Sequence, residues 1–266
     1  MTYLGIDIGS LSCDAVLVDH NGELLATSVV PTGARNQEAI ERVTGEVLAQ
    51  AGVARKAVKA VISTGYGRNR VEDRMASVTE ITCHARGINA LKPDVQLLID
   101  IGGQDSKTIR LDGGGQVVDF AMNDKCAAGT GRFLEAMARA LQVNIEVLSR
   151  LDRGARKDLT ISSMCTVFAE SEVVSLIAEG IEVKEITRGI NRAIASRIYA
   201  LVKRVARDLD GISIAMSGGV ARNEGVVRAL STVLNSRIYV PPVPDTVGAL
   251  GAALIARDRT TRNSQT

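Results

Sequence analysis

Hydrophobic residues recur along the chain at two spacings, one typical of strands and one typical of helices. Residues 3–8, YLGIDI, are mostly apolar and predict a buried strand, and an apolar stripe at helical spacing predicts a helix over residues 36–51. The strands predicted in the first third of the chain cover residues 3–8, 15–18, 23–30 and 57–63. Helical or mixed sequence continues to about residue 90, and Pro93 then marks a break.

The opening pattern restarts after this break. A shift of 93 positions places Asp7 on Asp100 and Gly9 on Gly102, and both copies run in the order strand, Asp-Ile-Gly, strand, Asp, glycine turn, strand. A looser echo pairs VISTGYGRNRV at 61–71 with IAMSGGVARNEGVV at 214–227 as strand-glycine-helix units. The repeat predicts an α/β protein of two lobes that share a duplicated β-β-β-α-β-α plan.

The two predicted lobes differ in how much helical sequence they carry. We expect residues 1–94 to form the first lobe and residues 95–258 the second, with the C-terminal helix free to pack back on the first lobe. Residues 259–266 are expected to be a disordered tail. The helices predicted in the second lobe cover residues 126–141, 166–178, 185–208 and 246–257, a further one begins at 146, and strands are predicted over 213–216 and 237–240.

Composition narrows the range of partners. The formal charge of +2 and the absence of tryptophan give no basis for nucleic-acid binding. The chain opens directly into a strand, which predicts no signal peptide, and no apolar run approaches the length of a membrane span. We therefore expect a cytoplasmic protein whose cysteines stay reduced and act in metal or redox chemistry.

The two Asp-Ile-Gly segments have the chemistry of phosphate cradles. Glycine lets backbone N–H groups approach a phosphate, and nearby hydroxyls add donors, as in the segment from Asp7 to Ser12 and the segment from Asp100 to Lys107. A carboxylate at each strand end would hold Mg²⁺ through water beside the phosphates. One such motif alone is also compatible with an ordinary strand and turn, but two copies in two lobes predict a nucleotide cleft between them.

Two other glycine-rich segments point in different directions. The chain contains no GxxxxGK[ST] sequence, and the triplet Gly113-Gly114-Gly115 fits a hairpin turn and not a dinucleotide fingerprint. The segment SGGVARN at 217–223 follows a predicted strand and opens a predicted helix. It suits close backbone approach to an adenosine, with the helix N-terminus near the phosphates.

Cysteine count and position suggest a metal cluster. Cys126 and Cys165 are each predicted at a helix N-terminus, where free N–H groups favour a thiolate, although small buried residues at helix starts are an equally good interpretation. A tetrathiolate cluster needs four ligands, and neither Cys13 in the first cradle nor Cys83 in a first-lobe helix suits a shared site. Two chains, each giving two cysteines across a two-fold axis, would supply all four.

These segments resemble known proteins at two levels. The two DIG segments and SGGVARN resemble the acetate and sugar kinase, heat-shock chaperone and actin superfamily, which implies two ribonuclease-H-like lobes with ATP bound in the cleft between them. More specifically, the chain resembles the BadF/BadG/BcrA/BcrD ATPase family, above all the activators of 2-hydroxyacyl-CoA dehydratases. The segments that carry this resemblance are TGYGRN at 64–69, EITCHARG at 80–87, DIGGQDSK at 100–107, MNDKCAAGTGRFLE at 122–135 and SSMCTVFAESEV at 162–173.

The resemblance implies an ATP-driven electron-transfer protein. Those activators are homodimers with one bridging [4Fe-4S] cluster, and the family's cysteine pair matches Cys126 and Cys165 here. They take an electron from ferredoxin or flavodoxin and pass it at very low potential to the dehydratase, while related subunits serve aryl-CoA reductases such as benzoyl-CoA reductase. MgATP is expected to close the lobes and so move the helices that follow the two cysteines.

The expected roles fall on three groups of residues. The catalytic candidates are Asp7, Asp100 and Gln104, with Gln104 ranked above Glu170 for orienting the attacking water. The residues expected to contact ATP or ADP are Gly9, Ser10, Ser12, Gly102, Gly103, Asp105, Lys107, Gly129, Thr130, Gly131, Glu170, Gly218, Gly219, Ala221 and Arg222. A small-molecule kinase of the same superfamily and a chaperone-like nucleotide-dependent binding module remain as alternatives, and neither requires Cys126 or Cys165.

Overall fold

The computed structural model describes residues 1–162 and 165–263 and contains two five-stranded sheets. The chain forms two compact units. Unit 1 comprises Met1–Gln96, Leu111–Val118 and Pro241–Thr266, and unit 2 comprises Leu97–Arg110 and Asp119–Val240. The predicted boundary after residue 94 lies close to the first crossing, but the hairpin turn at 111–118 and the C-terminal helix return to unit 1 because their contacts are with it.

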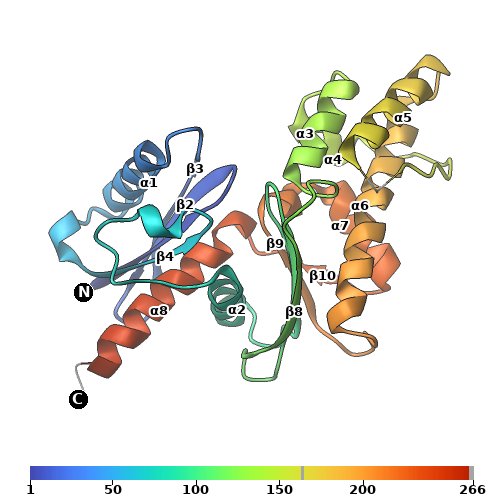
Figure 1. The fold of residues 1–266 in the computed structure, drawn as a ribbon. Helices are drawn as coiled ribbons and strands as arrows, with labels where there is room; N and C mark the ends of the chain where they lie inside the picture. The colour runs from blue at the N-terminus through green and yellow to red at the C-terminus, as the bar shows by residue number, and fades with distance from the viewer. Residues whose placement is uncertain (163–164, 264–266) are drawn as a thin grey trace. The chain divides into compact units, whose positions relative to one another are not determined.

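Unit 1 is a mixed sheet with a helix on each face. Its elements are β1 (Thr2–Ile8), β2 (Ser12–Asp19), β3 (Leu24–Pro31), α1 (Asn36–Ala51), β4 (Val58–Gly65), β5 (Ala76–Ser77), α2 (Glu80–Leu91) and α8 (Val247–Asn263). The strand order is β3-β2-β1-β4-β5, with β1 antiparallel to β2 and parallel to β4. Apolar residues of α1 pack on one face, and those of α8 pack on the other (Figure 1).

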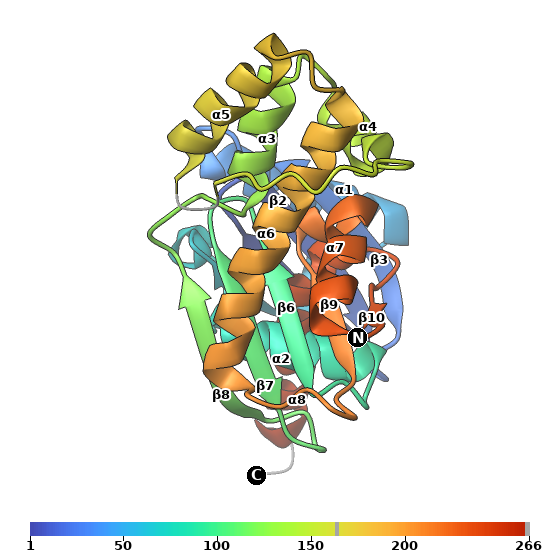
Figure 2. The same cartoon turned by 90° about the vertical axis from the view of Figure 1, so that its right-hand side faces the viewer.

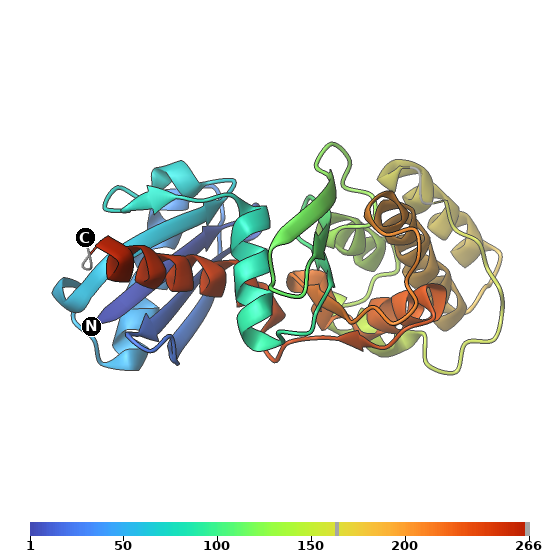
Figure 3. The ribbon, with the colours of Figure 1, turned by 90° about the horizontal axis from the view of Figure 1, so that it is seen from below.

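Helix α8 approaches α2 and β1 so closely that only glycine fits at the contacts. A Cβ on Gly251 would lie 1.7 Å from the carbonyl oxygen of Cys83, and one on Gly87 would lie 2.0 Å from that of Val247. A Cβ on Gly5 would likewise lie 2.0 Å from the carbonyl oxygen of Ala249. Such distances leave no room for a side chain, so these glycines allow α8 to lie directly on β1 and α2 to cross α8 at close range (Figure 3).

Unit 2 repeats the same sheet. Its elements are β6 (Leu97–Ile101), β7 (Ser106–Leu111), β8 (Val117–Asn123), α3 (Gly131–Ala140), α4 (Ile145–Leu151), α5 (Thr166–Ala178), α6 (Val183–Val205), β9 (Ile214–Ser217), α7 (Glu224–Leu234) and β10 (Ile238–Tyr239). The strand order β8-β7-β6-β9-β10 matches that of unit 1, and α6 covers one face of this sheet (Figure 2). In unit 1 Asp7 lies opposite Asp14, and in unit 2 Asp100 lies opposite Lys107, so the ladder register agrees with the predicted shift of 93 positions.

Most predicted elements are present, and three differ. Helices α1 and α5 have the predicted bounds. Helix α3 begins at Gly131 and not at Cys126, because Gly129 has a positive φ of 85° that ends any helix there. Helix α8 continues to Asn263, so residues 259–263 are helical where a disordered tail was predicted, and residues 264–266 lie outside the described part.

The third difference concerns the looser echo. In unit 2, strand β9 leads through the 3-10 turn η3 (Gly219–Arg222) into α7, as predicted. In unit 1, β4 leads only to the short 3-10 turn η2 (Arg68–Arg70), and α2 starts ten residues later at Glu80. None of the described helices is long and apolar enough to cross a membrane.

Candidate functional site

The first cradle is the turn between β1 and β2. The amide of Gly9 donates to the carbonyl of Ser12 (2.9 Å), and the hydroxyl of Thr32 donates to the carbonyl of Gly9 (2.9 Å). Ser12, predicted to contact phosphate, donates its hydroxyl to Asp14 (3.1 Å). The cradle therefore has a fixed backbone, and its strand-end carboxylate Asp7 lies opposite a second carboxylate, Asp14.

Asp7 is buried and confined on two sides by glycines. A Cβ on Gly65, which has a φ of +89°, would lie 2.5 Å from Asp7 Oδ1, and a Cβ on Gly248 would lie 2.2 Å from Asp7 Oδ2. The same Cβ on Gly248 would lie 2.9 Å from His84 Cε1. The first turn of α8 and the buried imidazole of α2 thus pack beside this carboxylate and restrict its orientation.

The second cradle has the same backbone and a different set of charges. The amide of Gly102 donates to the carbonyl of Asp105 (3.0 Å), as Gly9 does to Ser12. Asp100 Oδ1 accepts a hydrogen bond from Ser217 (2.8 Å), and its Oδ2 lies 3.3 Å from Lys107 Nζ. Lys107 also pairs with Asp105 at 2.5 Å, and the three charged residues are at most 4 % exposed. This cradle therefore contains a lysine where the first contains an aspartate.

The second cradle is joined to the start of α3 by backbone hydrogen bonds. The amides of Gly131 and Arg132 donate to the carbonyls of Gly102 (3.0 Å) and Gly103 (2.9 Å). The hydroxyl of Thr130 also donates to the carbonyl of Gly103 (3.0 Å). The helix and the cradle turn are thus one hydrogen-bonded assembly within unit 2.

Cys126 lies in the loop that precedes this helix. Its carbonyl accepts a hydrogen bond from Asn123 Nδ2 (2.9 Å), and the loop turns through Gly129, whose Cβ would lie 3.1 Å from Arg197 Cδ. The prediction that Cys126 begins a helix is wrong, because Thr130 has extended backbone angles as the N-cap residue of α3. Four residues, 127–130, lie between Cys126 and the cradle-bound first residue of the helix.

Cys165 is the N-cap residue of α5, as predicted. Its carbonyl accepts the first helical hydrogen bond, from Ala169 (3.1 Å), and its side chain makes no capping bond. Cys126 and Cys165 are both half-buried cysteines outside any disulfide, and α3 and α5 pack together in unit 2. Residues 163 and 164, which belong to the segment SSMCTVFAESEV, lie outside the described residues.

The other two cysteines have a different environment. Cys13 and Cys83 are fully buried in unit 1. Burial raises the pKa of the Cys83 thiol to about 12, and burial together with the charges of Asp14 and Asp7 raises the pKa of Cys13 well above its usual range. A thiol must lose its proton to bind a metal, so the raised pKa values make Cys13 and Cys83 poor ligands. Within the described chain, no group of three or more His, Cys, Asp or Glu side chains is placed to hold a metal.

The remaining predicted residues lie at different places. Gln104 is exposed at the tip of the second cradle turn, and Glu170 is exposed on α5. Gly218 has a φ of +83°, and its Cβ would lie 2.3 Å from the carbonyl of Ile101, so packing against β6 already requires glycine there. Gly219, Ala221 and Arg222 form η3. Ser10 lines a hollow in unit 1.

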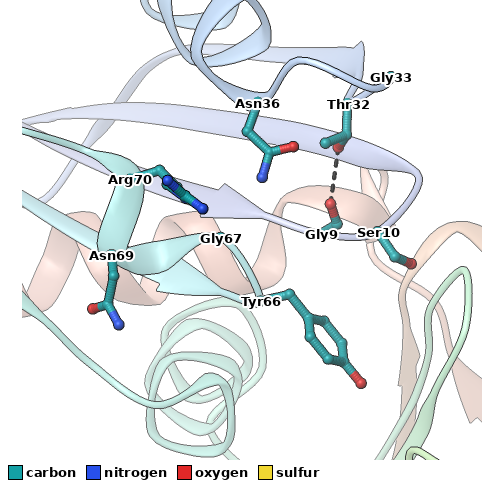
Figure 4. A pocket seen from close by; sticks show the side chains of 9 residues that line it. All are labelled: Gly9, Ser10, Thr32, Gly33, Asn36, Tyr66, Gly67, Asn69 and Arg70. Atoms are coloured by element: carbon teal, nitrogen blue, oxygen red, sulfur yellow. Dashed lines mark hydrogen bonds between the residues drawn. The ribbon is translucent and has the colours of Figure 1, made fainter.

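Several residues of this hollow were not predicted as site residues. It has a volume of about 550 Å³ and is lined by Gly9, Ser10, Thr32, Gly33, Asn36, Tyr66, Gly67, Asn69 and Arg70 (Figure 4). Tyr66 and Asn69 belong to the motif TGYGRN, which could have pointed to this region. Asn36 and Arg70 could not be found in this way, because a polar residue at a helix start or in a turn is common in any sequence.

Comparisons with known proteins agree with this architecture. The model of the BadF/BadG/BcrA/BcrD ATPase family matches residues 4–256. The chain belongs to this family. The 2-hydroxyisocaproyl-CoA dehydratase activator of Clostridioides difficile is 42% identical over 258 residues, which cover 97% of this chain and 96% of the relative. One of the subunits of benzoyl-CoA reductase from Thauera aromatica is 32% identical over 94% of this chain and 91% of its own length.

Solved structures confirm the predicted fold class. The crystal structure of the Clostridioides difficile activator with bound ADPNP superposes with a TM-score of 0.92 and 40% identity, covering all of this chain and 97% of that one. A ROK family glucokinase from Streptomyces griseus has a TM-score of 0.60 at 17% identity over 97% of this chain and all of its own, which shows a common fold alone. This family member thus has the actin-like ATPase and sugar kinase fold of two lobes.

Proposed function

We propose that this protein is an ATP-hydrolysing iron–sulfur activator that delivers a low-potential electron to a 2-hydroxyacyl-CoA dehydratase. One observation carries the proposal: the second cradle and the loop with Cys126 meet at the start of α3, through the bonds from Gly131 to Gly102 and from Arg132 to Gly103. A phosphate that moves the turn at 102–105 would pull on this helix directly. The similarity to dehydratase activators supports the same function.

The charges of the two cradles suit a magnesium nucleotide. Asp7 and Asp100 would hold Mg²⁺ through water, and the amide of Gly103 and the hydroxyl of Ser10 would contact phosphates. Lys107, held between two carboxylates, offers an ammonium group to the same phosphates. Gln104 is free at the tip of its turn to orient water, whereas Glu170 is an exposed residue of α5.

The nucleotide assignments extend to two further elements. In unit 2, Gly129 to Gly131 lie at the start of α3 beside the second cradle. The residues from Gly218 to Arg222 connect β9 to α7 and are assigned to the adenosine. Both elements lie at or near the N-terminus of a helix, where the helix dipole favours an anion.

The two half-buried thiols fit an iron–sulfur cluster shared by two subunits. Cys126 and Cys165 supply two ligands, so a homodimer supplies the four that a [4Fe-4S] cluster requires. Such a cluster would provide one-electron transfer when bound. Our assignment leaves Cys13 and Cys83 out, because their buried thiols are held in the protonated form.

The proposed partners follow from the enzyme that this protein would activate. We assign a dehydratase component as electron acceptor and ferredoxin or flavodoxin as donor. The similarity to the Thauera aromatica benzoyl-CoA reductase protein favours an aryl-CoA reductase as the second candidate. A small-molecule kinase ranks lower, because the nine residues that line the hollow beside the first cradle provide a guanidinium and amides and no carboxylate or imidazole base.

Anaerobic purification of the full chain tests the cluster. We expect about two irons per chain and a reducible paramagnetic centre. Cys126→Ser and Cys165→Ser should each abolish iron binding and weaken the dimer, while nucleotide binding by the single chain survives. The control Cys83→Ala should retain iron, because that thiol is not a ligand. A colourless wild-type protein that phosphorylates a sugar or an acid would refute the proposal.

The coupling is tested by nucleotide affinity. A ligand can shift a conformational equilibrium only through a difference in affinity for the two states. We therefore expect ATP and ADP to bind with different affinities when the dehydratase partner is present. Equal affinities in that complex would show that hydrolysis does not drive the transfer.

A further inference from the structure

The hollow of about 550 Å³ in unit 1 is a preformed feature that the proposed ATPase leaves largely unused. It begins at Gly9 and Ser10 of the first cradle and extends to Asn36 at the start of α1 and to Arg70 at the end of η2. Its volume is in the range of small-molecule sites. A magnesium nucleotide held by the two cradles requires neither Asn36 nor Arg70.

Two side chains of the hollow, those of Arg70 and Asn36, are donors without a described partner. Among the described residues, neither the Arg70 guanidinium nor the Asn36 side-chain amide takes part in a hydrogen bond or an ion pair. Figure 4 shows these two side chains facing each other, while Tyr66 and Asn69 point away from them. The nearby Glu38 pairs with Arg35 instead. The hollow therefore has a positive charge and no carboxylate among its lining residues.

The backbone around these donors is fixed. Gly67 donates its amide to the carbonyl of Ile8 (3.0 Å), and a Cβ there would lie 2.3 Å from Ile8 Cγ2 and 3.3 Å from Asn36 Nδ2. On the opposite side, Thr32 donates its amide to Leu11 (2.9 Å) and its hydroxyl to Gly9 (2.9 Å). The missing side chain at position 67 keeps the space below Asn36 open, and binding would require little rearrangement.

We propose that this hollow binds a small organic molecule that ends in a phosphate or carboxylate group. Arg70 would donate two hydrogen bonds to its oxygens, which is the pairing that a planar guanidinium makes best, and Asn36 would donate a third. The uncharged part of the ligand would extend toward Gly9 and Thr32. This site goes beyond the proposed ATPase function and does not depend on it.

Calorimetric titration of the full chain, without nucleotide, tests the site. The probes are glycerol 3-phosphate, inorganic phosphate and acetate, which separate an organic phosphate from the free ion and from a carboxylate. We expect Arg70→Gln to weaken the best probe about tenfold or more, because a hydrogen bond to a charged group is lost, and Asn36→Ala to weaken it by a smaller factor. The matched control is Arg55→Gln, an arginine of the same unit that pairs with Asp73 away from the hollow.

The outcomes are decisive because Arg70 is exposed and its replacement leaves the core intact. Equal affinity of wild type and Arg70→Gln would overturn the proposal, as would the absence of millimolar binding for all three probes. Inorganic phosphate that binds as tightly as glycerol 3-phosphate would overturn the assignment of an organic ligand. Because the titration uses neither ATP nor a cluster, its result is separate from that of the activator tests.

Discussion

In unit 1 Asp7 faces Asp14 across the first two strands, and in unit 2 the corresponding positions hold Asp100 and Lys107. The two turns have the same backbone hydrogen bond, from Gly9 to Ser12 and from Gly102 to Asp105. The first cradle thus has two facing carboxylates, whereas the second cradle has Lys107 opposite its carboxylate. On the proposed function both cradles contribute a carboxylate to the metal ion, and only the second adds an ammonium group for phosphate.

The units differ again in what joins the third strand to the fourth. In unit 1 α1 is the long helix of this connection, whereas in unit 2 the connection contains α3, α4, α5 and α6. Both half-buried cysteines lie within this additional segment. The additional helical segment therefore carries the proposed cluster ligands without any change in the strand order of the sheet.

The largest expected effect comes from removing the cation of the second cradle. Lys107→Met leaves Asp100 and Asp105 buried without their shared partner, so the free energy of unfolding should fall by about 3–5 kcal/mol, as measured by urea denaturation. The control Lys59→Met, at an exposed position, should change it by less than about 0.5 kcal/mol.

The corresponding change in unit 1 sharpens the contrast. Asp14→Asn removes one of two like charges that face each other, so we expect a loss of less than about 1 kcal/mol in the same experiment. If Asp14→Asn and Lys107→Met lower the free energy of unfolding by the same amount, the two cradles do not differ in the way that their charges predict.

A second prediction concerns the glycine beside Asp7. Gly248→Ala places a Cβ 2.2 Å from Asp7 Oδ2, which should lower the free energy of unfolding by about 1–3 kcal/mol and reduce ATP hydrolysis by displacing this carboxylate. Gly45→Ala is the control, because no atom lies within 4 Å of the Cβ that this substitution would add. This helical substitution should stabilise unit 1 by about 0.5–1 kcal/mol. Full activity in Gly248→Ala would remove Asp7 from the catalytic residues.

A smaller effect on stability is expected from substitutions in the paired segments 61–71 and 214–227. Asn223 caps α7 by accepting hydrogen bonds from Gly225 (3.0 Å) and Val226 (3.2 Å), so Asn223→Ala should cost about 1 kcal/mol in thermal or urea unfolding. In unit 1 Asn69 accepts from the Ser77 hydroxyl (3.2 Å) and caps no described helix, so Asn69→Ala should cost clearly less. Similar losses of unfolding free energy in both variants would contradict the structural difference between segments 61–71 and 214–227.

The smallest effect depends on pH and lies in the additional helical segment. The Glu185 carboxylate accepts hydrogen bonds from the amides of Arg156 (3.0 Å) and Lys157 (2.7 Å), and these bonds lower its pKa from the usual 4.5. Its contribution to stability is therefore present above pH 4.5 and disappears as the pH falls through the lowered pKa. Wild type should be more stable than Glu185→Gln at pH 7 and converge with it in acid, as thermal melts across pH would show. A constant difference would contradict this assignment.

Local patterns predicted much of the fold. The apolar stripe at helical spacing gave the bounds of α1, and the shift of 93 positions gave the register of both cradles, because each depends on neighbouring residues or on a direct repeat. The start of α3 was misplaced because the small residues after Cys126 are compatible with a helix in sequence, and only the positive φ of Gly129 excludes it.

Other features depend on contacts that sequence order does not reveal. The pairing of Lys107 with Asp105 requires the β7 backbone, and the packing of Gly248 beside Asp7 joins residues 241 positions apart. The hollow with Asn36 and Arg70 is formed by three segments that are separate in the sequence, and only the fold brings them together. The sequence could therefore suggest the cradles but not their charge partners.

The close packing of α8 on β1 and α2 has a consequence for the order of folding during synthesis. Residues of α8 complete one apolar face of the first sheet, where Val16, Val18 and Ile62 are fully buried. A ribosome that has finished α2 has not yet made this cover, and the whole of unit 2 must be translated first. The nascent unit 1 therefore exposes an apolar surface until α8 emerges from the ribosome. Its strands are synthesised first, but its fold is completed last.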